Sequence, residues 1–413
     1  MRRALVVVAA FAVAVAVFAR GSDPAVPVER PVLTGTTTDI PGLQRAVRGG
    51  RSDLRPALAE AYLQRARETA DPSYYAKAET VLGTPRTEEA FATAGELALA
   101  RHDFTRALTW GARAGTIGAP IRVDALVELG RLDEAERELQ AMIDRRPNLA
   151  GYARVSYVRE LRGDLPGAVE AMRLAVAAGG PAAENVAYVS AQLGELERRR
   201  GRPAAAKRAF AQALALVPGH AGAELGLARL DAATARAGAA PAAVDSPGLD
   251  AAIARLERLV ARLPLPEYVI ALGEAQLAAG KPAQRTFALV TAQRRLLDAA
   301  GVDTDVELAV FEADHGDADM AVALARGGYN AAPSARAADA LGWALTRAGK
   351  PREGLRYARL ALRDGAVDPL WLAHAGLAKA AAGKNGRREF ERALEHGLDG
   401  WPWQAQRVRR ALR

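Results

Sequence analysis

The chain has 413 residues, of which 50% are hydrophobic and only 5% aromatic, and its apolar residues are mostly Ala, Leu and Val. This composition can bury a large core, excludes disorder along the whole length, and favours closely packed helices over sheets. The chain has no cysteine, which excludes disulfides, thiolate zinc sites and cysteine nucleophiles, and its net charge of +8 comes from 56 basic and 48 acidic residues mixed along the chain. We therefore expect an all-helical protein with a general attraction for acidic partners.

The first residues have the layout of an export signal. Arg2 and Arg3 precede sixteen uncharged residues, Ala4 to Ala19, and polar residues follow. A run of this length lies between the core of a cleaved signal and the roughly 20 residues that span a bilayer, so residues 1–19 are predicted to be a signal peptide or a signal anchor. Because the basic flank favours the inside, we expect an extracytoplasmic protein that is secreted or anchored to the cytoplasmic membrane by residues 4–19, its only membrane contact.

A repeating helical pattern follows a Pro-, Thr- and Gly-containing stretch, residues 20–50, which is predicted to be a flexible spacer. In the clearest repeat unit, Gly194 is followed by Ala206 twelve residues later, by Ala213 after seven more and by Pro218 after five more. The same spacing recurs, wholly or in part, at Gly95, Ala107 and Ala114; at Ser156, Ala168 and Ala175; at Ala309, Ala321, Gly328 and Pro333; and at Gly342, Gly354 and Ala361.

Small residues at these positions have a physical reason. Two antiparallel helices that pack at close range need side chains of almost no volume where their axes approach. A Gly seven residues after the first position, as at Gly163 and Gly201, can take the left-handed conformation that ends a helix, and a Pro soon afterwards, such as Pro203, suits the start of the next helix. The spacing therefore predicts repeated pairs of antiparallel helices.

These positions resemble the motif of the tetratricopeptide repeat family over most of residues 51–398. The resemblance implies an all-α fold, a right-handed superhelical solenoid of about ten antiparallel helix pairs. The pairs are expected to begin near Asp53, Thr87, Ile121, Ala150, Val186, Ala221, Pro266, Asp303, Ala335 and Leu370. A loop of small residues is expected to interrupt the array at about residues 237–250, and residues 399–413 are expected to form a C-terminal capping helix.

The sequence contains no catalytic motif of the G-x-S-x-G or H-E-x-x-H type and no phosphate-binding glycine loop. Its densest charged cluster is an acidic turn of Glu312, Asp314, His315, Asp317 and Asp319, which could hold a hard cation but also has the composition of a helix-capping turn. The arginines do not alternate with aromatic residues, as a nucleic-acid groove would require. We expect no enzyme activity, no cofactor, no metal and no nucleic-acid partner.

In the family that this chain resembles, the first helices of the pairs line a concave groove that holds peptides or partner helices. Carried over to this chain, the groove-facing candidates for partner binding are Arg154, Tyr157, Tyr188, Gln192, Glu195, Glu267, Glu274, Arg336, Asp339, Trp343 and His374. Exposed aromatic and arginine side chains are good binding anchors, although Tyr157 and Trp343 could instead pack between pairs.

The resemblance therefore implies an extracytoplasmic scaffold or adaptor that holds a protein or peptide partner in its groove. One alternative is a structural scaffold of the cell envelope that associates with copies of itself. Another is an enzyme or metalloprotein that uses the acidic turn at His315. The sequence leaves the identity of the partner and the oligomeric state open.

Overall fold

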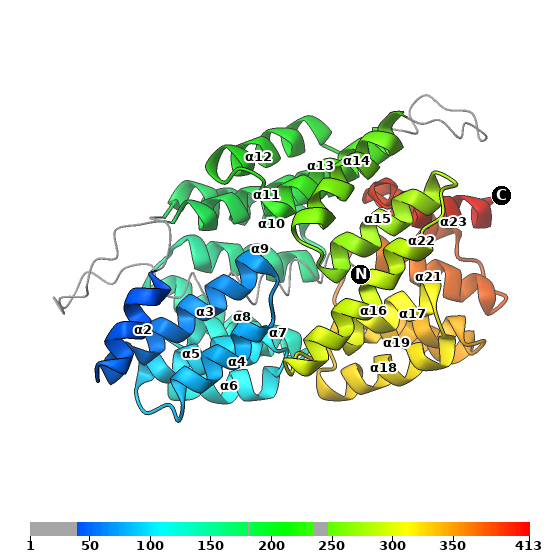
Figure 1. The fold of residues 1–413 in the computed structure, drawn as a ribbon. Coiled ribbons are helices and arrows are strands. Elements are labelled where there is room, and N and C mark those ends of the chain that lie inside the picture. The colour runs from blue at the N-terminus through cyan, green and yellow to red at the C-terminus, as the bar shows by residue number, and fades with distance from the viewer. Residues whose placement is uncertain (1–38, 181, 235–246) are drawn as a thin grey trace.

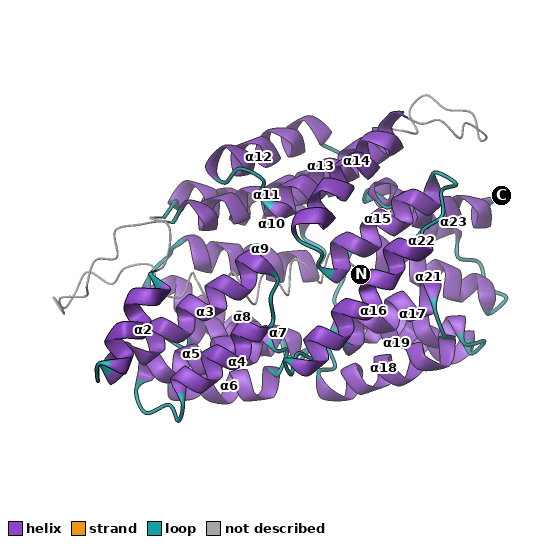
Figure 2. Ribbon diagram, viewed as in Figure 1, coloured by secondary structure: helices purple, strands orange, loops and turns teal. Residues whose placement is uncertain are grey.

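The computed structural model of the chain describes residues 39–180, 182–234 and 247–413. The predicted export signal, residues 1–19, and most of the predicted spacer lie outside the described residues. All regular elements within the described ranges are helices, as the all-α prediction requires (Figure 2). None of the helices in these ranges combines the length and the apolar character needed to cross a bilayer.

Twenty of the described helices form ten consecutive pairs, in which each helix packs against the next one along the chain (Figure 1). The pairs are α3 (Arg55–Thr69) and α4 (Ser73–Leu82); α5 (Glu88–Ala100) and α6 (Phe104–Arg113); α7 (Ala119–Glu128) and α8 (Leu132–Arg145); α9 (Leu149–Leu161) and α10 (Leu165–Ala178); α11 (Ala183–Arg199) and α12 (Pro203–Leu216); α13 (Ala221–Thr234) and α14 (Pro247–Arg262); α15 (Pro266–Ala278) and α16 (Gln284–Ala299); α17 (Asp305–His315) and α18 (Ala318–Ala331); α19 (Ala335–Arg347) and α20 (Pro351–Ala361); and α21 (Pro369–Ala381) and α22 (Arg387–Glu395).

The small residues lie where the two helices of a pair approach most closely. Ala107, Ala168 and Ala206 are all fully buried at this position. In the ninth pair both positions are Gly, and a β-carbon added to Gly342 would lie only 2.9 Å from the carbonyl oxygen of Gly354. The predicted spacing therefore marks the packing contact of these pairs, because a larger side chain would force the axes apart.

The seventh pair departs from the common spacing in a way that the sequence pattern did not reveal. The buried residues that follow Gly273 are Ala283 and Val290, so each lies two residues earlier than the common spacing places it. At the other described joints the second helix of one pair lies close to the first helix of the next, but the backbones of α16 and α17 hardly approach each other. The ring of Phe287 in α16 bridges this joint, with its centroid 5.4 Å from that of Phe311.

Successive turns of the solenoid touch each other along their edges. The turn between the two helices of one pair lies against the loop before the sixth pair after it. The amide of Asp303, before α17 of the eighth pair, donates to the carbonyl of Arg101, in the turn of the second pair, at 3.1 Å. In the same register, a β-carbon on Gly163, at the turn between α9 and α10, would overlap the carbonyl oxygen of Gly365, before α21. His102 takes the place of the turn glycine in the second pair, in the left-handed region with φ of 62°.

Two predicted boundaries differ from the structure. Residues 39–50 were expected to belong to the spacer, but α2 (Ile40–Arg48) forms there, with Asp39 accepting from the amide of Gly42 at 2.8 Å and Leu43 buried. Ile40, Leu43 and Val47 share one face of this helix, but nine residues that include Pro41 and Gly42 are too few for the period to stand out from the spacer before them. The predicted insertion, residues 237–250, is shorter at its end, because α14 already begins at Pro247; residues 237–246 lie outside the described residues.

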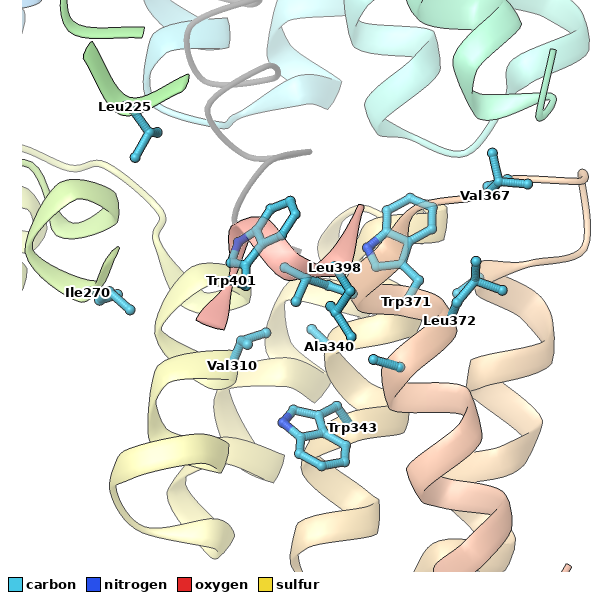
Figure 3. Close-up of a cluster of buried hydrophobic side chains, with 14 of the residues drawn as sticks. Leu225, Ile270, Val310, Ala340, Trp343, Val367, Trp371, Leu372, Leu398 and Trp401 are labelled. Carbon is cyan, nitrogen blue, oxygen red and sulfur yellow. The ribbon is translucent and has the colours of Figure 1, made fainter. Parts of the chain in front are cut away.

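The C-terminal segment turns inward. A short 3₁₀ helix, η2 (Leu398–Gly400), lies against α13, and the final helix α23 (Pro402–Leu412) contacts α15 and α21 as well as α22. Leu398 and Trp401 are buried among side chains of α13, α15, α17, α19 and α21, as Figure 3 shows. Besides extending the array at its end, as a cap would, this segment therefore lies across the first helices of the sixth to tenth pairs.

Candidate binding surface on the first helices

The eleven residues predicted to face a groove all lie on first helices, and all of them are buried. At most 9% of the surface of any of them is exposed: Arg154, Tyr157, Tyr188, Gln192, Glu195, Glu267, Glu274, Arg336, Asp339, Trp343 and His374. The expectation of exposed aromatic and arginine anchors therefore does not hold for these side chains, because they contact other parts of the chain. Their part in binding a partner stays a prediction.

Buried ion pairs join the first helices of neighbouring pairs and of successive turns. Arg154 in α9 donates from Nε and Nη2 to both carboxylate oxygens of Asp124 in α7, at 2.9 and 3.0 Å. Burial raises the pKa of Asp124 to about 8, and the neighbouring Arg154 opposes this rise. Across the turns, Arg336 in α19 donates to Glu128 in α7 at 2.6 Å. Pairs of this kind fix how the helices sit, since breaking one would leave an uncompensated buried charge.

Glu195 in α11 belongs to the same polar layer. Its carboxylate lies 3.2 Å from Nε of Arg198, which also donates to the carbonyl of Gly397 at 2.8 Å and so joins α11 to the C-terminal segment. Burial raises the pKa of Glu195 to about 7, while the charges of Arg229 and Arg199 act in the opposite direction. The layer therefore contains a carboxyl group that titrates near neutral pH.

The most connected polar cluster lies at the joint between the seventh and eighth pairs. Glu274 of α15 and Asp314 of α17 are buried, and both accept hydrogen bonds from the side-chain amide of Gln404 in α23, at 3.4 and 2.8 Å. Arg407 of α23 donates to Asp314 at 2.7 Å, and the indole N–H of Trp343 donates to the same oxygen at 3.1 Å. This cluster holds the final helix against two first helices.

Aromatic rings surround the cluster. His315 lies 3.1 Å from Glu274 through Nε2, and its ring centroid is 4.4 Å from that of Phe287 and 4.6 Å from that of Trp403. The guanidinium carbon of Arg407 lies 4.7 Å above the Trp403 ring and 4.8 Å above the Trp343 ring. A cation placed over aromatic faces gains electrostatic attraction beyond its ion pair. The site is thus suited to an arginine on a helix.

A metal ion has a candidate ligand set here, but not the one that the acidic turn suggested. Glu274, Asp314 and His315 offer ligand atoms within 4.8 Å of one another. Of the other residues of the turn, Asp317 caps α18 by accepting from the amide of Met320 at 2.7 Å, and Glu312 accepts from the amide of Asp317 at 3.1 Å. A cation at the buried site would have to displace Arg407 from Asp314.

A second polar pair lies beside this cluster. Nδ1 of His374 in α21 is 2.9 Å from the carboxylate of Asp339 in α19, and the ring stacks on Trp343 with 4.5 Å between centroids. Sequence reasoning placed all three residues on facing first helices, and the structure brings them together. It missed Gln404 and Arg407, because their partners lie about 90 to 130 positions earlier in the chain.

Comparisons with known proteins add little to this description. No protein-family model matches the sequence, and no curated protein matches it. Among solved structures, the human IFIT1 dimer with m7Gppp-AAAA is similar at 14% identity and a TM-score of 0.47, over 86% of this chain and 85% of that one. A tetratricopeptide repeat protein from Parabacteroides merdae gives 14% identity and a TM-score of 0.34, over 65% and 98%. Yeast Tom70 gives 11% and 0.34, over 90% and 95%. No residue, ligand or partner is carried over from them.

The geometry of this chain defines its class. Ten helix pairs follow one another, and small residues lie at the contact inside most of them. The first helices, which we call the inner layer, also meet across successive turns, as Arg336 of α19 does with Glu128 of α7. The protein is an all-α solenoid of helix-pair repeats, the fold that its resemblance to tetratricopeptide repeats implied.

Proposed function

We propose that this protein is an extracytoplasmic scaffold that binds a segment of another protein on the inner layer of first helices. One observation carries the proposal: the inner layer already binds a polypeptide segment, residues 398–413 of the chain itself. Leu398 and Trp401 enter it as apolar anchors, and Gln404 and Arg407 follow as polar ones. A surface that accepts a short segment through a few buried aromatic and arginine side chains has the character of a protein-binding site.

The proposed location outside the cytoplasmic membrane rests on the sequence. Arg2 and Arg3 followed by the apolar residues 4–19 have the order of an export signal. N-terminal sequencing of the native protein tests this part. A mature start near Arg20 supports a secreted form and an intact N-terminus in the membrane fraction supports an anchored form, whereas an intact N-terminus in the cytoplasmic fraction would contradict export.

The binding function is tested by chemical crosslinking in cells of the full-length protein carrying an affinity tag, followed by purification and mass spectrometry. We expect one or a few protein partners to be enriched over a tagged, exported control protein. If no protein is enriched after crosslinking, the scaffold proposal loses its support.

A further inference from the structure

We infer that α23 is an internal ligand of the inner layer, and that the segment a partner inserts is a basic helix that takes the place of α23. This inference rests on the proposed function for the existence of a partner. The sequence of α23 indicates what the partner's segment contains: a Trp near its start, a Gln and an Arg three residues apart, and no acidic residue.

The contacts of α23 are selective for this chemistry. Gln404 is buried and donates to both Glu274 and Asp314, and Arg407 completes the set on Asp314. Charge-assisted hydrogen bonds of this kind recognise donors only, so an acidic side chain at position 407 would be repelled by two carboxylates. The apolar side of α23 is small by comparison, because its fully buried apolar residues are Ala405 and Val408.

The joint beneath α23 is the weakest of the described joints. The backbones of α16 and α17 hardly approach each other, whereas α23 holds both sides of this joint. On one side Gln406 donates to the carbonyl of Ala278, at the end of α15, at 2.9 Å. On the other side Arg407 holds Asp314 in α17. An incoming helix that makes the same contacts would therefore bridge the same two pairs.

The packing of α23 permits exchange. Its fully buried apolar residues are Ala405 and Val408, so little apolar surface holds it against the inner layer. Gln406 and Arg410 are exposed on its outer side, whereas Trp401, just before it, is buried and 4.7 Å from the guanidinium carbon of Arg229. We therefore place the hinge at Trp401 and Pro402, with η2 remaining in the core.

The experiment uses a fluorescent synthetic peptide of residues 402–413 as the probe. The full-length chain with Arg407→Glu, in which the internal helix is weakened, is expected to bind the peptide by anisotropy. The unchanged chain is expected to bind the peptide at least about tenfold more weakly, because α23 occupies the site most of the time. A peptide carrying the same Arg407→Glu change is the matched control and is expected not to bind.

A second arm locks the helix. The chain has no cysteine, so Ala278→Cys with Gln406→Cys provides two unique thiols that a short bis-maleimide can join across the Gln406 contact. Joining them in the unchanged background is expected to abolish the remaining peptide binding, and cleaving a reducible form of the linker is expected to restore it. If Arg407→Glu unfolds the chain, judged by circular dichroism, Arg407→Ala replaces it.

Two results would overturn the inference. One is a folded release variant that does not bind the peptide, and the other is a locked chain that binds it as well as the unlocked chain does. Partner capture separates this inference from the proposed function. If the locked chain still captures the crosslinked partner, the partner binds elsewhere and only the inference falls. If the peptide binds but cells yield no partner, the scaffold proposal falls instead.

Discussion

Arg407, six residues before the end of the chain, donates from Nη1 to the buried carboxylate of Asp314 at 2.7 Å, across the joint between the seventh and eighth helix pairs. Asp314 has no exposed side-chain surface, whereas 15% of the Arg407 side chain is exposed. The contact therefore joins the end of the chain to the middle of the array. The stability of that joint therefore depends in part on the final helix, beside the Phe287–Phe311 and Glu274–His315 contacts that also cross it.

Removal of the Arg407 side chain tests this dependence. We expect Arg407→Ala to lower the free energy of unfolding by about 2–4 kcal/mol, because Asp314 then keeps a buried charge with fewer donors. Arg410→Ala in the same helix is the control: Arg410 is exposed, and the change should stay within about 0.5 kcal/mol. Urea unfolding followed by circular dichroism measures both. Equal effects of the two changes would contradict the assigned role of Arg407.

Glu195 predicts a pH dependence of stability. Its pKa is about 7 in the folded protein because it is buried, against 4.5 as the ordinary value. The folded state therefore holds this proton more tightly than the unfolded state, and stability falls as pH rises from about 4.5 to about 7. The loss is up to about 3 kcal/mol. Glu195→Gln should remove this part of the dependence, whereas Glu257→Gln at an exposed position should leave the curve unchanged. Identical curves for all three proteins would refute the shift.

The edge contact between turns of the solenoid can be measured with two glycines of similar conformation. Gly163 has φ of 79° and Gly201 has φ of 69°. A β-carbon on Gly201 meets nothing within 4 Å, so Gly201→Ala should cost only about 1–2 kcal/mol for the left-handed backbone. Gly163→Ala should cost about 1–3 kcal/mol more, because its methyl group would overlap Gly365 in the next turn. Thermal unfolding compares them, and equal losses would mean that the turns do not touch in solution.

The close approach inside the ninth pair gives a similar comparison. Gly342→Ala should destabilise the protein by about 1–3 kcal/mol, because the added carbon would lie 2.9 Å from the carbonyl oxygen of Gly354. In α13, Gly222 has room for a methyl group, with the nearest atom at 3.4 Å. Gly222→Ala should therefore stabilise the protein by about 0.5–1 kcal/mol through helix propensity. Opposite signs of the two changes are the expected result, and a neutral Gly342→Ala would contradict the packing described.

The sequence predicted the fold well because the repeat pattern is local. Residues such as Gly342 and Gly354 meet within one helix pair, so their spacing along the chain carries the contact directly. The shorter spacing after Gly273 escaped detection because Phe287 and Val290 follow a pattern that occurs again only in the tenth pair, at Phe390 and Ala393. The short helix α2 escaped because its nine residues include Pro41 and Gly42 and follow directly on the Pro-, Thr- and Gly-containing stretch.

The inner layer was harder to predict from the sequence. Which side chains of the first helices are exposed depends on how successive turns stack, and that depends on small rotations summed over six pairs. Arg336 therefore looked like an anchor for a partner, but it meets Glu128 of the preceding turn. The docking of Gln404 and Arg407 depends on the path of the last 16 residues through space, and no local sequence pattern predicts where this segment packs.

The central claim is that a partner binds on the inner layer at the site that α23 occupies. Photo-crosslinking in cells tests it most directly, with a photoreactive amino acid placed in the full-length protein either at Ala278, beside the contact with Gln406, or at Leu174, which is 46% exposed on the second helix α10. We predict that a partner protein is captured from position 278 and not from position 174. Capture from position 174 alone, or from neither position, would contradict the account.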